Sequence, residues 1–268
     1  MSLIKRVNLE RKFRFILLIL FVTLSNFSLI RITKLTFITE KIGFIQPGML
    51  DFLVNLCKGT TEVKISKDTF YIPVDPGFMG IQFLVLLLVS DISSLKLRGN
   101  EHVFLKFKNR YEWWISRCIS IIVTVVLSYF LIVLECLLFG LISGGGLGVH
   151  DAFSTYSLGV RTWNMHGEEL FFITVVFQIV FAVSICLFQN MLSLITGPVL
   201  SVAAVMAMEI SSVFIKNKWL FGNYQMLLRL NKFVGSRVSL SFGLILAVVL
   251  AVSSVFFGCV CVRKRDIY

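Results

Sequence analysis

The side chains best suited to catalysis in this chain are two adjacent glutamates, Glu168 and Glu169, and three histidines. A metal ion or an activated water requires several such side chains at one place. The histidines, His102, His150 and His166, all lie outside the long apolar segments, and none follows the glutamate pair. We therefore expect no catalytic residue and no metal site, and we interpret the glutamates as the negatively charged start of a helix.

An intramembrane hydrolase is the alternative interpretation of Glu168 and Glu169. Intramembrane proteases of the CAAX-processing type also place a glutamate pair at a helix start. They follow it with an arginine, at the position that Phe172 holds here, and supply histidines from later helices, which this chain lacks. The hydrolase interpretation predicts that Glu168→Gln and Glu169→Gln abolish activity.

Two further acids, Glu135 and Glu209, fall inside apolar segments and are candidates for lining a substrate path. Glu135 is about 33 Å along a helix from Trp113, which puts it at the outer interface. Glu209 is about 16 Å past Pro198, near the membrane midplane. A charge at that depth costs at least about 2.5 kcal/mol. Glu209 therefore is protonated, is paired or faces a wet cavity. The simpler alternatives are a hydrogen bond in helix packing or a position nearer the interface.

The elements that carry these residues are transmembrane helices. The 268-residue chain is 57% hydrophobic and 15% charged, whereas soluble domains carry about 25% charged residues. Residues 170–208 and 238–262 contain no charged side chain, and about 20 apolar residues cross a membrane. The net charge of +11 fits basic loops that fix membrane orientation, so we expect no nucleic-acid partner.

Six spans fit the sequence, as one all-α membrane domain with both termini in the cytoplasm. The 39-residue run 170–208 is too long for one crossing and must form a hairpin, with Gln189 and Asn190 at its turn and Pro198 opening the next helix. Fourteen of the 26 basic residues then lie on the cytoplasmic side. The spans are residues 13–32, 76–95, 113–142, 170–189, 197–215 and 238–262.

The outer segments are less regular. Residues 34–75 form a long outer loop that contains Cys57, and the alternation of apolar and charged residues near its end predicts a small strand-like element. The glycine-rich stretch after Gly144 indicates a flexible outer loop. The amphipathic segment 216–237 is expected in or partway into the outer interface, with Trp219 and Tyr224 at headgroup level.

A basic insert, residues 95–118, separates the second and third spans. Its apolar side chains recur at helical spacing with charges on the other faces, so it predicts an amphipathic helix at the inner surface. Such a helix can lie on anionic lipid or dock into a groove on a cytoplasmic partner. The candidate contact residues are Glu101, His102, Val103, Phe104, Phe107, Lys108 and Tyr111.

The layout resembles the permease subunit of ABC-2-type transporters. Four features carry the resemblance: the amphipathic basic segment SLIKRVNLERKFRF before the first span, the insert GNEHVFLKFKNRYEWWISR with Arg117 opening the third span, the short uncharged turn between spans four and five, and the amphipathic outer segment before a last span that ends in RKRDIY. The long loop 34–75 departs from the simplest members and leaves room for an outer gate or an extra contact.

The resemblance implies an amphipathic N-terminal helix, a coupling helix in the insert and a place in the bacterial plasma membrane. It also implies a second permease subunit, identical or related, and separate cytoplasmic ATPase chains that bind ATP and Mg²⁺. The chain itself has no phosphate-binding loop, so we expect it to hold no cofactor and to be no enzyme. The expected function is export of an amphipathic substrate such as a peptide. A membrane anchor or sensor that recruits a cytoplasmic partner is the alternative.

Overall fold

The computed structural model describes residues 3–39, 45–61, 75–94, 109–160, 162, 165–234 and 238–264. Within these ranges the regular structure is helical, apart from one isolated bridge between Leu230 and Val238. The expectation of an all-α membrane protein is confirmed, since four helical segments are long and apolar enough to cross a membrane. These are residues Arg11–Leu35, Arg110–Ser143, Gly167–Thr196 and Leu240–Arg263.

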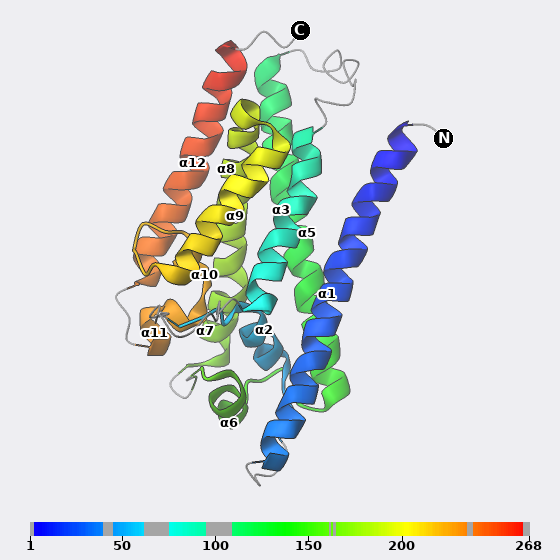
Figure 1. Ribbon diagram of the computed structural model, residues 1–268, viewed down its shortest axis with the longest axis vertical. Helices are drawn as coiled ribbons and strands as arrows, with labels where there is room; N and C mark the ends of the chain where they lie inside the picture. The colour runs from blue at the N-terminus through cyan, green and yellow to red at the C-terminus, as the bar shows by residue number, and fades with distance from the viewer. Residues whose placement is uncertain are drawn as a thin grey trace, which may run out of the picture.

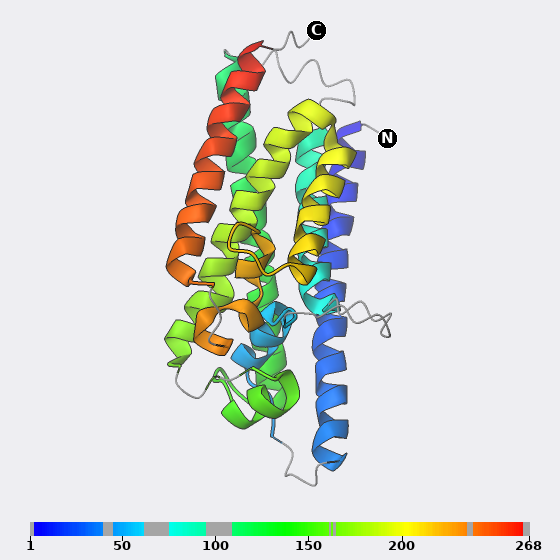
Figure 2. The same cartoon turned by 60° about the vertical axis from the view of Figure 1, so that its left-hand side comes forward.

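The helices form an elongated bundle (Figures 1 and 2). The six long segments are α1 (Leu3–Thr39), α3 (Pro76–Ser94), α5 (Arg110–Ser143), α7–η3–α8 (Gly167–Phe171, Phe172–Val176, Phe177–Thr196), α9 (Pro198–Phe214) and α12 (Leu240–Lys264). The short ones are α2 (Met49–Cys57), α6 (Asp151–Phe153), η2 (Ser154–Leu158), α10 (Gly222–Gln225), η4 (Leu227–Arg229) and α11 (Asn231–Val234). A helix therefore occupies each of the six predicted spans.

Helices α5 and α8 form the centre of the bundle, and α1 and α12 lie on its flanks. The most apolar window of the Gly167–Thr196 segment is 67% buried, against 22% in α1 and α12. Both α1 and α12 leave many large apolar side chains exposed, as helices that face lipid do. A Cβ on Gly258 would lie 1.9 Å from the Trp114 ring, so glycine is what lets α12 approach α5 here.

The start of α1, the end of α3, the start of α5 and the end of α12 all lie at one end of the bundle (Figure 1). The turn between α8 and α9 lies at this end too (Figure 2). The opposite end carries α2, α6 and the loop after α5.

Three sequence expectations about the fold are wrong, and the first concerns the hairpin of spans four and five. The hairpin exists, but its turn is at Gly197, where φ is +91°, a conformation that favours glycine. Gln189 and Asn190 are instead fully buried in α8, and Gln189 donates a hydrogen bond to the carbonyl of Leu86 at 3.2 Å. A buried side-chain amide can stay inside a helix when a neighbouring helix provides an acceptor for its hydrogen bond, so Gln189 does not mark a turn.

The N-terminal amphipathic segment is also not a separate element, because α1 is one helix from Leu3 to Thr39. The stretch after Gly144 is held in place rather than flexible. Gly146 accepts a hydrogen bond from the Met49 N–H at 2.9 Å and donates one to the carbonyl of Gly140 at 3.1 Å.

Candidate functional site: a buried polar centre closed by α2

Helix α2 is the main departure from the expected outer loop. All nine residues of Met49–Cys57 are buried, and the helix packs against α5 and α3 in the half of the bundle away from the chain termini (Figure 1). Seven of the nine residues of MLDFLVNLC are apolar, and its two polar residues, Asp51 and Asn55, are buried as well, so the helix has no solvent face and is stable only inside the protein. Cys57 is therefore a buried helix terminus, and its prediction as a loop residue is wrong. The predicted strand-like element falls on residues 62–74, outside the described residues.

Asp51 fixes α2 to the neighbouring loop. Its carboxylate accepts hydrogen bonds from the N–H of Gly48 at 2.9 Å, the N–H of His150 at 3.2 Å and the hydroxyl of Ser154 at 2.7 Å. The first bond caps the start of the helix. Burial raises the pKa of Asp51 from 3.8 to about 6, although these three bonds lower it. One side chain thus connects the loop after α5, η2 and α2.

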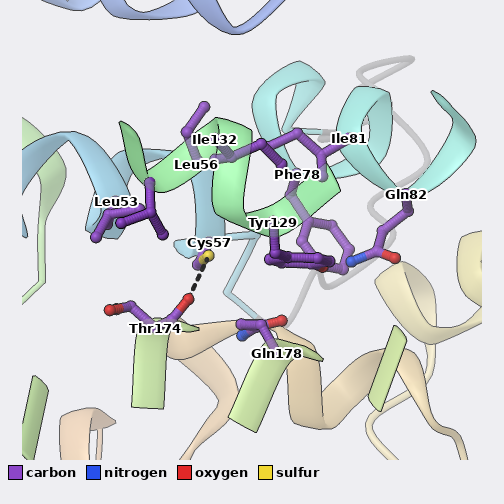
Figure 3. A pocket seen from close by; sticks show the side chains of 11 residues that line it. Leu53, Leu56, Cys57, Phe78, Ile81, Gln82, Tyr129, Ile132, Thr174 and Gln178 are labelled. Atoms are coloured by element: carbon purple, nitrogen blue, oxygen red, sulfur yellow. Dashed lines mark hydrogen bonds between the residues drawn. The ribbon is translucent and has the colours of Figure 1, made fainter. Parts of the chain in front are cut away.

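A small pocket lies beneath α2 (Figure 3). Its volume, counted as the positions that the centre of a water molecule can occupy, is about 10 Å³. This is close to the minimum for a single water molecule. The lining residues come from α2, α3, α5, η3 and α8: Leu53, Leu56, Cys57, Phe78, Ile81, Gln82, Tyr129, Ile132, Val133, Thr174 and Gln178.

Polar groups converge on this cavity from different helices. The side chains of Tyr129 and Gln82 are hydrogen-bonded to each other. The Cys57 thiol donates to the carbonyl of Thr174 at 3.7 Å, drawn as the dashed line in Figure 3. Gln178 donates to the carbonyl of Gln225 at 2.8 Å and so connects the cavity to α10. This polar layer lies among helices that are otherwise apolar.

Glu209 extends the polar layer on the α9 side. It is 2% exposed, and its Oε2 atom has no hydrogen-bond partner among the residues that the structure describes. A Cβ on Gly222 would lie 2.4 Å from that oxygen, so α10 packs directly against the carboxylate. Both side-chain amide atoms of Gln225 are also buried without a described partner. A polar atom of this kind is what a water molecule or a polar ligand group can satisfy.

The segment after α9 folds into the bundle through Arg229. The guanidinium is 1% exposed and donates to the carbonyl oxygens of Thr60, Thr61 and Val213, and to Oδ1 of Asn223. It thereby joins the chain after α2 to the end of α9. A buried arginine is stable here because protein oxygens accept its hydrogen bonds.

The prediction that Trp219 and Tyr224 both lie at headgroup level is wrong for Tyr224 and stays a prediction for Trp219. Trp219 is 60% exposed. Tyr224 is fully buried, stacks on Phe181 with ring centroids 5.5 Å apart and donates to the carbonyl of Lys218 at 2.7 Å. The segment enters the bundle because its polar groups have partners there.

The sequence-predicted site residues lie in separate places. Of the coupling residues, only Tyr111 is described, on an exposed position near the start of α5; Glu101, His102, Val103, Phe104, Phe107 and Lys108 fall within 95–108, outside the described residues. Glu135 faces α1 and accepts a hydrogen bond from Thr23. It lies at the α1–α5 contact, whereas Glu209 contacts α10.

The glutamate pair begins a helix, as the sequence indicates. Glu168 and Glu169 occupy the first turn of α7. Glu169 forms an ion pair with Lys232 on α11, and both side chains are more than a third exposed. Within the described ranges no group of three or more His, Cys, Asp or Glu side chains is placed to hold a metal ion.

Sequence reasoning missed Asp51, Gln82, Gln178 and Arg229. For Gln82 and Gln178 a signal exists, because an amide inside a long uncharged run must find a partner in the membrane. For Asp51 and Arg229 no local pattern distinguishes a buried charge from a loop charge.

Comparison with protein families, with curated proteins and with solved structures finds no match for this chain. The fold and the site themselves define the class: a helical membrane protein with a polar centre that is covered at one end by a short inserted helix.

Proposed function

We propose that this chain is the membrane-spanning permease subunit of an ATP-driven exporter of the ABC-2 type. A separate ATPase chain, with its ATP and Mg²⁺, drives alternating access, and a second permease subunit completes the pathway. The six long helical segments are the six spans. At 19 and 17 residues, α3 and α9 measure about 28 and 26 Å, close to the hydrocarbon thickness of about 30 Å.

One observation carries this proposal. The end of α3 and the start of α5, which flank the basic insert, lie at the same end of the bundle as the start of α1 and the end of α12 (Figure 1). The insert therefore starts and ends at the end of the bundle where α1 begins and α12 ends. A force on it acts directly on α3 and α5, which line the polar cavity.

The polar centre is the proposed substrate path in its closed state. Gln82, Tyr129, Gln178 and Glu209 offer hydrogen bonds to the polar groups of an amphipathic peptide, and the apolar wall accepts its apolar side chains. Helix α2 closes the path at the outer end and is the proposed outer gate. Glu135 lies where α1 meets α5 and is the second acid proposed for the path. The proposed location is the bacterial plasma membrane.

Affinity purification tests the proposal. The detergent-solubilised chain is isolated from its native host as wild type and as Phe104→Asp, and the co-purifying proteins are identified. We expect an ATPase with a phosphate-binding loop to accompany the wild type and to be lost with the variant, since a charge on the apolar face of the insert prevents docking.

Leu147→Asp is the matched control. It places the same charge on an exposed apolar residue at the opposite end of the bundle, where Leu147 is 61% exposed. It should keep the ATPase. If no ATPase accompanies any of the three proteins, the exporter proposal fails and the insert is a lipid-surface helix or a dock for another partner.

A further inference from the structure

A polar contact joins α1 to α5 at Glu135. The residue is 9% exposed, and one of its carboxylate oxygens is hydrogen-bonded to the Thr23 hydroxyl, whereas Oε2 has no partner among the described residues. Asn26, one turn after Thr23 on α1, is fully buried and donates to the Cys136 sulfur at 3.8 Å. The Asn26 Oδ1 atom also lacks a described partner. Side-chain oxygens without donors therefore collect at one contact between two helices.

The oxygens at this contact outnumber the hydrogens that can bind them. The Thr23 hydroxyl has one hydrogen but two acceptors, Glu135 and the carbonyl oxygen of Ile19, which lies 2.9 Å away. Glu135 makes no ion pair with a described residue. A water molecule would supply hydrogens but would leave the carboxylate charge unbalanced, and a buried charge is stable only when it is paired. A cation binds the oxygens and also balances the charge.

The available ligands fit a monovalent metal ion. Glu135 offers two side-chain oxygens, and Asn26 and Thr23, which share one face of α1, offer one each. Hard cations prefer such oxygen ligands, but calcium takes about six to eight of them, more than this contact provides. One positive charge also balances one carboxylate, so the filled site is neutral in its apolar surroundings.

The contact lies near a membrane surface, where water can deliver an ion. Ser25, next to Asn26, lies beside the first turn of α3, since a Cβ on Gly77 would lie 3.6 Å from the Ser25 hydroxyl oxygen. With 19 residues, α3 is only about as long as the hydrocarbon layer is thick, so its first turn lies near the edge of that layer. Thr23 is partly exposed, which places the contact at the rim of the bundle.

We propose that Glu135, Asn26 and Thr23 bind an alkali-metal cation, Na⁺ or K⁺, that joins α1 to α5. Both helices supply oxygens to the same ion, which fixes α1, a flanking helix whose most apolar window is only 22% buried. This site uses one acid and two neutral side chains, unlike a centre of three or more His, Cys, Asp or Glu residues, of which the described ranges contain none. It does not depend on the proposed transport function, because its ligands and its test concern this chain alone.

Thermal unfolding of the purified protein in dodecyl maltoside tests the site, in sodium, potassium or choline chloride at one concentration. Choline keeps the ionic strength but is too bulky to enter the contact. We expect the better-bound metal ion to raise the wild-type Tm by at least about 3 °C over choline. Glu135→Gln and Asn26→Leu should lose this difference. The matched control is Glu209→Gln, which removes another buried acid and should keep it.

The salt that gives the larger rise identifies the ion. A wild-type Tm that is the same in all three salts overturns the proposal, as does a Glu135→Gln variant that keeps the difference. A Tm that depends on pH through Glu135 but not on the salt means a bound proton and overturns it too. Should the variants not fold, equilibrium dialysis of the wild type with radioactive sodium or potassium decides. Saturable binding of one ion per chain supports the site, and its absence refutes it.

Discussion

Asp51 shows how a single buried acid can organise the end of the bundle that carries α2 and α6. Its carboxylate caps α2 and binds the loop and turn that follow α5, so three chain segments depend on one side chain. Arg229 has the corresponding role for the segment after α9. Both are charges inside protein, and both are matched by several hydrogen bonds, which is the condition for burying a charge.

Asp51 makes stability depend on pH. Because its pKa is raised from 3.8 to about 6 in the folded protein, the unfolded chain releases the Asp51 proton at lower pH than the folded chain does. The contribution of Asp51 to stability is therefore full below about pH 4 and is lost as the pH rises to about 6. A shift of this size corresponds to about 3 kcal/mol, or roughly 6 °C in Tm.

The measurement is the Tm of wild type and Asp51→Asn between pH 4 and pH 7, taken as a difference so that other acids cancel. Relative to the wild type, the variant should gain about 6 °C across that range. Parallel Tm curves for the two proteins would contradict the role of Asp51.

At the scale of elements, two short segments, α2 and residues 222–230, are buried inside the bundle. Helix α2 is fully buried, and the segment 222–230 contributes buried residues from Gly222 to Leu227. Neither is long enough to cross a membrane. Each fills the bundle from one end, and together they contact the polar centre through Cys57 and Gln225.

Removing Arg229 should loosen one of these segments. Arg229→Met keeps the size of the side chain but leaves four oxygens without their donor, which costs about 3–5 kcal/mol. Hydrogen exchange should rise in residues 58–61 and 213–230 and stay unchanged in α12. The control is Lys232→Met, since Lys232 is 45% exposed in a surface ion pair and such pairs contribute little. Equal exchange in both variants would refute this role.

Movement of α2 can be followed through its own thiol. Cys57 is 8% exposed and should react slowly with a maleimide in the closed state. If α2 is the outer gate, ATP and Mg²⁺ added to the complex with its ATPase should speed the labelling of Cys57 at least about tenfold, because opening exposes the thiol. The experiment uses a variant in which Cys57 is the only cysteine.

The matched control for this labelling is a variant with only Cys186, which is 1% exposed in α8 and does not line the cavity. Its labelling should not change with nucleotide. A Cys57 rate that ignores nucleotide, in a complex that hydrolyses ATP, would show that α2 is a fixed part of the fold.

At the scale of the whole molecule, the bundle has two unlike ends. One carries the start of α1, the end of α12 and the ends of α3 and α5 that flank the basic insert (Figure 1). The other carries α2 and the loop after α5, tied together by Asp51. This division fits the proposed function, in which an ATPase acts on one end and α2 closes the path at the other.

Reporter fusions test the orientation of these ends. A green fluorescent protein at the C-terminus should fluoresce in bacteria, and an alkaline phosphatase there should be inactive, because both report a cytoplasmic end. Insertion of either reporter after Leu147 should give the opposite result. The same signal at both positions would mean that the two ends do not face opposite sides of the membrane.

The sequence alone predicts the six long helices and the hairpin of spans four and five. Long uncharged runs have few alternatives in a bilayer, where each backbone group must be satisfied within its own helix. It also predicts the helix start at Glu168 and Glu169, since charge near a helix N-terminus is a local effect. These features need no knowledge of what lies beside them.

Only the tertiary structure decides which polar residues are buried together. In the sequence, Asp51 and Arg229 resemble charged loop residues. In the structure, a donor to Asp51 comes from a segment about 100 residues away, and an acceptor for Arg229 from one about 170 residues away. Gln189 likewise resembles a turn residue in the sequence, but in the structure its amide donates a hydrogen bond to the carbonyl of Leu86. The burial of α2 likewise depends on α5 and α3 around it. Hydrogen bonds and packing between distant segments leave no periodic trace in the sequence, because each partner alone is compatible with a loop.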